Sequence, residues 1–291
     1  MLIQVLISGL VVGCVYGLIA LGYSLIYKAS GLMTFAQGDI LTLGAFMGYT
    51  FYGVLKIPFF ISLILVVIIV FLLGLMIEKV IIRRLLSKHT MAIYIVLATI
   101  AVSYIIQNGS TVIWGTKMLY FPRIFKTIKT INIANTPIQT EAAFSIGVAI
   151  ICMLGLHFFM KYTRFGTAMR ASAMDAMAAK ACGINPSLAT GITWGIAAGI
   201  AALAGMLIGP IYGVFITLGA TIGRKGFASA VMGGYGNMYG AMLGGIILGL
   251  VETMTATYIS SSYKDLVAYG LLLAFLYVRP TGILNERAIA D

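Results

Sequence analysis

The chain has 291 residues, of which 61% are hydrophobic and only 9% are charged, and its mean hydropathy is +1.05. Soluble domains carry about 25% charged residues, so this composition excludes an ordinary soluble protein and predicts an all-α protein that crosses the membrane several times. The formal net charge of +11 is the excess expected of a membrane protein with Lys and Arg in its cytoplasmic loops, and we expect no nucleic-acid partner.

Long runs with few or no charges define the predicted crossings, since about 20 residues span the roughly 30 Å of hydrocarbon. Six runs are long enough: 1–27, 57–77, 90–116, 142–160, 181–223 and 226–251. Two shorter runs, 40–55 and 266–278, are candidates for tilted or partly buried spans. The run 181–223 is too long for one helix and is expected to hold one full span and a broken or re-entrant piece. We therefore predict a single transmembrane domain over residues 1–291, with eight or nine crossings.

The first run has no basic residue ahead of its apolar part and is too long for the apolar region of a signal peptide, so we expect a retained first helix. The next segment, SGLMTFAQGD at residues 30–39, is unusually polar for its place between two uncharged runs. A solvent loop is one interpretation, and a short re-entrant or broken element is the other. In the second interpretation Phe35 fills space, Gln37 offers a hydrogen bond, Gly38 lets the backbone turn and Asp39 caps the following helix.

Basic residues predict the orientation of the chain in the membrane, because Lys and Arg are enriched in cytoplasmic loops. Two short loops and the C-terminal segment carry such residues, and we expect them to be cytoplasmic: Lys79, Arg83, Arg84, Lys88 and His89; Lys161, Arg164, Arg170 and Lys180; Arg279 and Arg287. The region 117–140 is also basic, but one crossing separates it from the cytoplasmic loop on either side, so it must be outside. Its basic residues are Lys117, Arg123, Lys126 and Lys129. The N-terminus is then outside and the C-terminus cytoplasmic.

The predicted cytoplasmic loop 163–186 reads TRFGTAMRASAMDAMAAKACGINP. Thr163 can cap a helix, and Gly183 with Asn185-Pro186 can end it, so we expect one short helix of about four turns. Its small Ala residues and exposed Met residues suit docking into a groove of a cytoplasmic partner. A helix lying on the lipid headgroups is an equally good interpretation of the pattern alone.

The second half of the chain echoes the polar segment of the first. GRKGFASAVMGGYGNMYGAMLGG at 223–245 resembles SGLMTFAQGDILTLGAFMG at 30–48 in its aromatic and glycine pattern. Paired glycine-interrupted segments in two halves point to a translocation path, here through Gly233, Gly234, Gly236 and Asn237. Close helix packing through small residues, as at Gly240/Gly244 and Gly245/Gly249, is the alternative explanation.

The chain lacks the motifs of an enzyme or a self-powered pump. It has no phosphate-binding loop, no HExxH motif, no metal-binding cysteine pattern and no sign of a cofactor. Cys14, Cys152 and Cys182 are expected to be buried free thiols. Asp39 and Glu252 lie beside span ends and are expected to be interfacial anchors rather than proton carriers. Energy for transport would then come from another subunit.

Four stretches carry a family resemblance: SGLMTFAQGDILTLGAFMG, TRFGTAMRASAMDAMAAKACGINP, FASAVMGGYGNMYGAMLGGIILGLVE and SSYKDLVAYGLLLAFLYVRPTGIL. In this order, from about residue 5 to 285, they resemble the LivH/LivM permeases of branched-chain amino-acid ABC transporters, and the first, third and fourth are closer to LivH. The pattern R-x-G-x-x-x-R-A-x-A-x-D…G-I-N at 164–185, together with R-P-T-G-I-L at 279–284, is the most specific part. One local difference is Gln37, where many relatives have His.

This resemblance implies a permease of a bacterial or archaeal inner membrane with the fold of an ABC importer permease. Its partners would be a second, LivM-like permease subunit, two cytoplasmic ATPase subunits and an extracytoplasmic substrate-binding protein, which could use the outer loop 115–140. Loop 163–186 would be the coupling helix that docks on an ATPase subunit. The residues on the family pattern are Arg164, Gly166, Arg170, Ala171, Asp175, Gly183, Ile184 and Asn185.

Branched-chain amino acids are the expected substrates of such a permease. Three alternatives stay open at this point: a permease of the same family for urea, amides or other amino acids, an ATP-independent channel or secondary carrier, and an assembly scaffold.

Overall fold

The computed structural model describes residues 2–87, 91–122, 124, 130–133, 136–279 and 281–284. Their regular structure is almost entirely helical, as predicted. The β-strands among these residues form one antiparallel hairpin of β1 (Thr130–Ile133) and β2 (Thr136–Gln139), with Thr130 opposite Gln139. Six basic residues used to predict the orientation lie outside the described part of the chain: Lys88, His89, Arg123, Lys126, Lys129 and Arg287.

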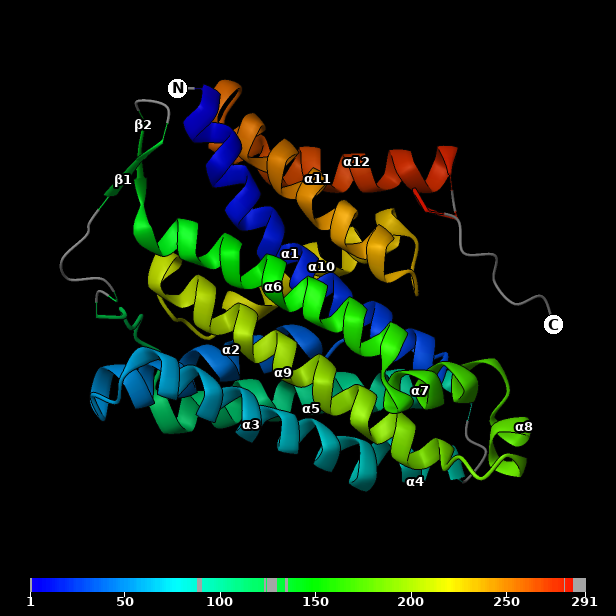
Figure 1. Cartoon of the computed structure of the whole chain (residues 1–291). Coiled ribbons are helices and arrows are strands. Elements are labelled where there is room, and N and C mark those ends of the chain that lie inside the picture. Colours follow the sequence, from blue (N-terminus) through cyan, green and yellow to red (C-terminus); the bar gives the residue numbers. More distant parts are fainter. Residues whose placement is uncertain are drawn as a thin grey trace.

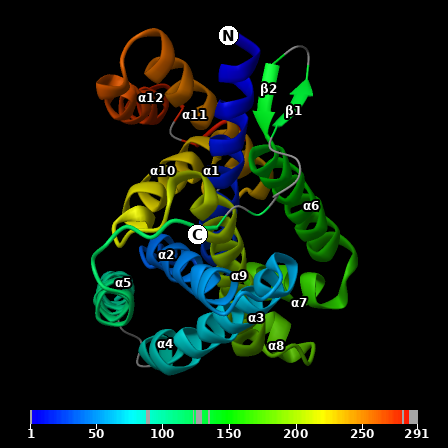
Figure 2. The same cartoon turned by 90° about the vertical axis from the view of Figure 1, so that its left-hand side faces the viewer.

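Two helices, α1 (Leu2–Ser30) and α9 (Pro186–Tyr212), form the centre of the molecule. In their most apolar windows 78% and 83% of the residues are buried, against 22–28% in α3, α5 and α6. Figures 1 and 2 show the latter three at the periphery. Because α1 and α9 already pack against protein on most sides, the outer helices are the ones left to face lipid or another subunit.

Six helices within the described residues are long and apolar enough to cross a membrane. Besides α1 and α9 they are α3 (Phe59–Ile77) with its continuation through the π-helical η2 (Glu78–Ile82) into α4 (Arg83–Ser87), α5 (Ala92–Trp114), α6 (Thr140–Tyr162) and α11 (Met238–Tyr258). Shorter elements account for the remaining segments predicted from the sequence. They are α2 (Gln37–Gly48) with the π-helical η1 (Tyr49–Val54), α10 (Leu218–Gly233), and α12 (Lys264–Val278) with its preceding turn η3 (Ser261–Tyr263).

The long run 181–223 is divided as expected. Pro210 still lies within α9, which ends at Gly213, where φ is +78°, and α10 begins at Leu218. The prediction of one span over 226–251 is wrong, because the chain leaves the helix between α10 and α11. Gly234 and Gly236 there have φ values of +108° and +97°, which side chains other than glycine rarely adopt.

The loop 163–186 forms two helices, α7 (Arg164–Met174) and α8 (Ala176–Ala181), so the prediction of a single helix is wrong. The break is at Asp175, whose backbone is extended and whose carboxylate accepts hydrogen bonds from the N–H groups of Met177 and Ala178 at 2.7 and 2.9 Å. Aspartate competes with a continuing helix in this way and is favoured as a cap. The predicted cap at Thr163 is confirmed, since its hydroxyl accepts from Gly166 N–H at 3.0 Å.

Helices α4, α7 and α8 gather at one end of the molecule, together with the C-terminal end of α12, whereas the hairpin and the start of α1 lie at the opposite end (Figure 1). The two ends of the described chain are therefore on opposite sides. Between them, α1 and α11 form the most extensive helix pair, and they approach closely through glycines. A Cβ at Gly245 would clash with the backbone of Gly17, and one at Gly249 with that of Gly13. The packing explanation for these two GxxxG residues is confirmed.

Candidate functional site

A cavity of about 410 Å³ lies where the start of α2 meets α10. Its walls come from five helices and from the connection between α1 and α2. They contribute Tyr23, Phe35, Gly38, Asp39, Ser103, Gly219, Ala220, Gly223, Arg224, Phe227, Tyr269 and Leu272. Segments from both halves of the chain therefore meet at this cavity, and Figure 2 shows α2 and α10 side by side, with α5 at the edge of the molecule.

Close backbone contact between α2 and α10 forms part of the cavity wall. A Cβ at Gly38 would clash with the carbonyl oxygen of Gly219, and a Cβ at Gly219 would clash with that of Gly38. The Gly219 N–H donates a 2.7 Å hydrogen bond to Thr42 Oγ1, so one orphan donor at the start of α10 is satisfied by α2. Because neither glycine carries a side chain, the two helix starts lie in direct backbone contact and fix each other's position.

Two charged residues line this cavity. Asp39 is only 5% exposed. Its Oδ2 accepts a hydrogen bond from Ser103 Oγ of α5, whereas Oδ1 has no partner among the described residues. Arg224 of α10 is exposed at the cavity, and its Nε donates to the Ala220 carbonyl of the same helix at 2.9 Å. The cavity therefore offers a carboxylate oxygen and a guanidinium group.

The rest of the wall is mostly aromatic or apolar. Phe35 and Phe227 have their ring centroids 5.6 Å apart, and Phe227 meets Tyr23 edge-on at 5.7 Å. Tyr269 and Leu272 of α12 complete this surface. Such a combination of an apolar wall with a few polar groups is typical of small-molecule sites.

The structure places three of the four path residues from the first half, Phe35, Gly38 and Asp39, at the cavity. The fourth, Gln37, is fully buried and points away from it. Its Nε2 donates to the Ala197 carbonyl of α9 at 2.6 Å. Gln37 thus fastens the start of α2 to the central helix.

Two local expectations for this segment are wrong. The chain turns at Gly31, where φ is +66°, and not at Gly38, which lies inside α2. Asp39 does not cap the helix, because α2 begins at Gln37 and places Asp39 in its first turn. A carboxylate in a first turn still interacts favourably with the positive end of the helix dipole.

The four path residues predicted in the second half lie at the turn between α10 and α11 and do not line the cavity. Gly233 packs against Gly240, and Gly234 against Gly282. Asn237 caps α11 by accepting from Tyr239 and Gly240 N–H at 3.0 and 3.1 Å. The observed contacts of Gly233, Gly234, Gly236 and Asn237 are thus those of a turn and of close packing.

Sequence reasoning missed the residues of α10 that do line the cavity. Gly219, Gly223 and Phe227 follow one another at intervals of four, which places them on one face of a helix. Arg224 stands in the same element, beside Lys225, and these two are the charged residues of α10. The four-residue spacing and the arginine could have pointed to these positions. They indicate one helix face, however, only if residues 218–233 are known to form a separate helix.

A charge cluster around the buried Lys225 was also missed. Lys225 Nζ lies 2.5 Å from Glu252 Oε1 and 2.7 Å from Asp265 Oδ1, and Tyr16 donates to Glu252 Oε2 at 2.8 Å. The expectation that Asp39 and Glu252 are interfacial anchors is wrong, because both side chains are buried inside the protein.

The predicted coupling segment forms a surface at the end of the molecule that carries α4, α7 and α8. Arg164, Arg170, Asp175, Gly183 and Asn185 are exposed there, while Ala171 and Ile184 are half-buried. Gly166 is buried because α7 turns closely against the end of α6, where a Cβ would meet the Met160 backbone.

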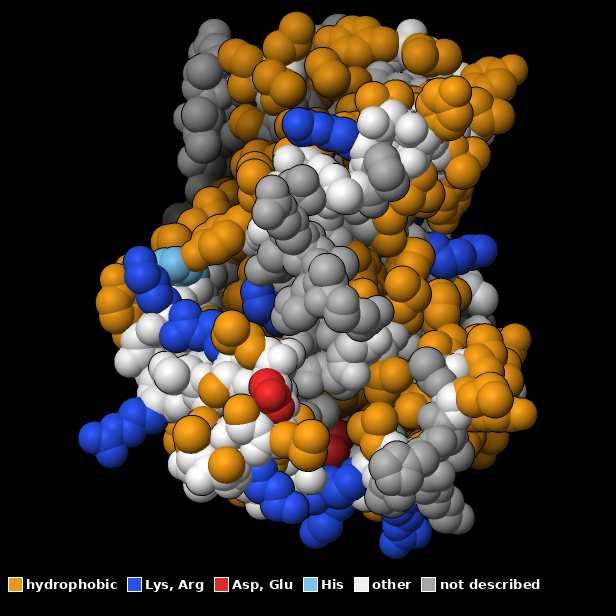
Figure 3. All heavy atoms as spheres, turned by 90° about the vertical axis from the view of Figure 1, so that its right-hand side faces the viewer, with side chains coloured by type: hydrophobic (Ala, Val, Ile, Leu, Met, Phe, Trp, Pro, Cys, Tyr) orange, Lys and Arg blue, Asp and Glu red, His pale blue; other side chains and the backbone are white. Residues whose placement is uncertain are grey.

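Two methionines flank the break between α7 and α8 and are strongly exposed, Met174 at 77% and Met177 at 85%. Figure 3 shows many Lys and Arg side chains on this face of the molecule. Exposed flexible methionines beside basic groups suit contact with a protein partner. The prediction of three buried cysteines is wrong at this surface, since Cys182 is exposed, while Cys14 is buried and Cys152 half-buried.

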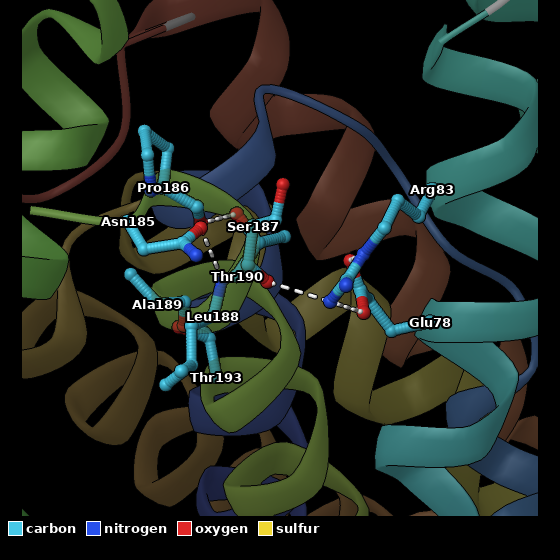
Figure 4. Close-up of polar contacts among 9 residues, drawn as sticks. All are labelled: Glu78, Arg83, Asn185, Pro186, Ser187, Leu188, Ala189, Thr190 and Thr193. Carbon is cyan, nitrogen blue, oxygen red and sulfur yellow. Dashed lines mark hydrogen bonds and ion pairs between the residues drawn. The ribbon is translucent and has the colours of Figure 1, made fainter. Parts of the chain in front are cut away.

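An ion pair connects this surface to the membrane helices (Figure 4). Arg83 Nη2 lies 2.7 Å from Glu78 Oε2, and its Nε donates to Oε1 at 3.2 Å. The same Nη2 donates to the Ser187 carbonyl at 2.9 Å. Because Ser187 is in the first turn of α9, this contact joins the α4 extension of α3 to the helix that follows α8.

Residues 5–276 match the family model described as "Branched-chain amino acid transport system / permease component". The chain belongs to this family of permeases. It is 33% identical to the high-affinity branched-chain amino acid transport system permease protein LivH of Salmonella typhimurium, over 98% of this chain and 96% of the relative. It is 32% identical, with the same coverage of both chains, to LivH of Escherichia coli K12 and to BraD of Pseudomonas aeruginosa.

A solved structure with a similar fold is PsaBC from Streptococcus pneumoniae in complex with Fab. The TM-score is 0.52, with 16% sequence identity, over 96% of this chain and 92% of that one. At this identity the similarity concerns the fold alone. Membership of this permease family indicates a role in membrane transport, and the apolar helices of the described residues agree with it.

Proposed function

We propose that this permease is the membrane subunit of an ATP-driven importer of branched-chain amino acids. The observation that carries the proposal is the match to LivH and BraD permeases along nearly the whole chain. The exposed α7–α8 surface and the cavity between α2 and α10 supply the two further features that such a subunit needs. The first would be the ATPase contact and the second part of the solute route.

The partners follow from this assignment. Two ATPase subunits would hydrolyse ATP on the cytoplasmic side, a second permease subunit would complete the route, and an extracytoplasmic binding protein would deliver the amino acid. The three outer helices α3, α5 and α6 expose much of their surface, which leaves ample area for a second permease or for lipid. The permease itself would carry out no chemical reaction.

The proposed location is the inner membrane of a bacterium or archaeon, with the N-terminus outside and the C-terminus in the cytoplasm. Support comes from the basic residues that gather at the α7–α8 end, where cytoplasmic loops should lie. Among the described residues these are Lys79, Arg83, Arg84, Lys161, Arg164, Arg170 and Lys180.

The contacts described above suggest how ATP hydrolysis would reach the solute route. Closure of the ATPase pair would shift α7 and α8, and Asn185 caps α9 directly after them by accepting from Leu188 N–H at 3.3 Å. The Arg83–Ser187 contact would pass the displacement to α3, and the contact of Gln37 with α9 would pass it to α2. The walls of the cavity would then move relative to one another.

Reconstitution of the whole importer tests this proposal. We expect ATP-dependent uptake of radiolabelled leucine into vesicles that hold the permeases and ATPases, with the binding protein added outside. Asp175→Lys and Arg164→Gln should reduce uptake and the leucine-stimulated ATPase activity together, because both residues are exposed on the α7–α8 surface.

Lys264→Gln, at the start of α12 and outside the α7–α8 surface, is the matched control for loss of one positive charge. Unchanged coupling in both α7–α8 variants would refute the docking surface. Uptake that proceeds equally without nucleotide would favour an ATP-independent channel or carrier instead.

A further inference from the structure

We infer that the cavity between α2 and α10 binds the amino acid itself during transport, with Asp39 holding its ammonium group and Arg224 its carboxylate. This inference rests on the proposed function and adds a substrate site within the permease. The two charged residues lie on segments from different halves of the chain and line one cavity.

One carboxylate oxygen of Asp39 lacks a hydrogen-bond donor among the described residues. Its side chain is 5% exposed, and Ser103 satisfies only Oδ2. Oδ1 is buried without a hydrogen-bond partner among the described residues, and no ion pair to Asp39 occurs among them. Buried carboxylate oxygens are nearly always hydrogen-bonded or paired with a cation, because an unpaired charge is costly to remove from water. An ammonium group with its three N–H donors would supply what Oδ1 lacks.

Arg224 provides the complementary charge. A guanidinium group presents several N–H donors in one plane and binds a carboxylate through two parallel hydrogen bonds. Only its Nε is used within α10, in the bond to Ala220. A carboxylate in the cavity could therefore be held from the α10 side while the ammonium group is held from the α2 side.

The remaining wall suits an apolar side chain. Phe35 and Phe227 form a tilted aromatic pair, and Leu272 adds an aliphatic surface from α12. The volume of about 410 Å³ falls within the roughly 300–1,000 Å³ of small-molecule pockets. An uncharged solute such as urea would leave both the carboxylate and the guanidinium unpaired, so the cavity favours a zwitterion with an apolar side chain.

The first experiment measures leucine binding by the purified complex of permeases and ATPases without the binding protein. Asp39→Asn and Arg224→Gln keep the approximate size of each side chain and remove its charge. Each should weaken binding of radiolabelled leucine by about tenfold to a hundredfold, since a hydrogen bond to a charged group contributes about 1.5–3 kcal/mol. Glu141→Gln, which removes a carboxylate in the first turn of α6 away from the cavity, should leave binding unchanged.

Two leucine analogues separate the roles of the charges. 4-Methylpentanoate lacks the ammonium group and 3-methylbutylamine lacks the carboxylate, so both should compete poorly with leucine in the wild-type complex. In Asp39→Asn the advantage of leucine over 4-methylpentanoate should disappear, and in Arg224→Gln its advantage over 3-methylbutylamine should disappear. A purely structural role for either residue would weaken all three ligands equally, which would overturn the inference.

Further variants keep the test decisive if Asp39→Asn does not assemble. Asp39→Glu retains the charge and should retain discrimination against 4-methylpentanoate, whereas Ser103→Ala should reduce it by loosening Asp39. If the Arg224→Gln defect occurs only in vesicles of anionic lipid, Arg224 binds a lipid phosphate and the carboxylate assignment is wrong.

Failure of this inference can be told apart from failure of the proposed function. ATP-dependent leucine uptake by the wild type, with unchanged leucine binding in both charge variants, would contradict the proposed binding site but not the importer function. Absence of ATP-dependent leucine uptake by the wild type would contradict the proposed importer function.

Discussion

Lys225 is the residue whose surroundings are least expected for a membrane segment. The residue is only 3% exposed, and its ammonium group lies between the carboxylates of Glu252 and Asp265. Glu252 in turn accepts from the Tyr16 hydroxyl, so four helices, α1, α10, α11 and α12, meet at one charge cluster. A buried ion pair gains little over an apolar pair, but removal of one partner leaves an uncompensated charge.

Lys225→Met should therefore destabilise the permease strongly, by about 3–5 kcal/mol. The measurement is the midpoint of thermal unfolding of the purified complex in detergent. Lys225→Met combined with Glu252→Gln should recover part of the loss, because the buried carboxylate is then neutral and can still accept from Tyr16. A double variant less stable than Lys225→Met would contradict a charge-based origin of the effect.

At the scale of elements, the pair of α1 and α11 depends on the absence of side chains along one seam. Gly249→Val should push the two helices apart, since a Cβ there clashes with the backbone at Gly13. We expect loss of most of the folded, monodisperse protein in size-exclusion chromatography. Gly270→Val in α12, where a Cβ meets nothing within 4 Å, is the matched control and should behave like the wild type. Equal yields of both variants would show that the seam tolerates separation.

The contact between Arg83 of α4 and the start of α9 is the second element-scale feature with a measurable role. Arg83→Gln removes the ion pair to Glu78 and weakens the bond to the Ser187 carbonyl. It should lower the number of leucine molecules imported per ATP hydrolysed, because the polar link between the start of α9 and the extension of α3 would be lost, and only the packing of α3 against α9 would still pass the movement on.

The measurement for Arg83→Gln is uptake and ATP hydrolysis in the same vesicles. Lys79→Gln, an exposed neighbour on the same segment, is the control. Arg83→Lys should rescue little, since a lysine cannot reproduce the two-point contact with Glu78. A normal ratio of uptake to hydrolysis in Arg83→Gln would rule out this route of coupling.

For the whole molecule, the apolar runs predict the class and most of the segments, because the bilayer demands long uncharged helices wherever the chain crosses it. Helix caps such as Thr163 can also be predicted from the sequence, since they depend on a few adjacent residues. The break at Asp175 was missed because Ala and Met on both sides favour a helix, and one carboxylate decides the outcome.

Features that depend on which helices are neighbours could not be read from the chain. Gln37 and Asp39 are two residues apart, yet one faces α9 and the other the cavity, and this difference requires the position of α9. The pairing of Lys225 with Glu252 and Asp265 likewise requires that α10, α11 and α12 meet. A charge in an apolar segment signals only that some partner exists.

The proposed orientation of the whole molecule can be tested with a residue that the chain already carries. Cys182, beside α8, is exposed, whereas Cys14 is buried in α1 and Cys152 is half-buried in α6. With the N-terminus outside, a membrane-impermeant maleimide should label Cys182 in inside-out vesicles but not in intact cells. Leu2→Cys in a Cys182→Ser background should give the opposite pattern, because Leu2 is exposed and α1 begins at the other end of the molecule (Figure 1).

The same labelling reports on the α7–α8 surface. If an ATPase subunit docks there, Cys182 should react more slowly in the assembled importer than in the permeases alone, while Leu2→Cys should react at the same rate in both. Labelling of Cys182 from outside intact cells would reverse the orientation. Equal rates of Cys182 labelling with and without the ATPase subunits would place the docking surface elsewhere.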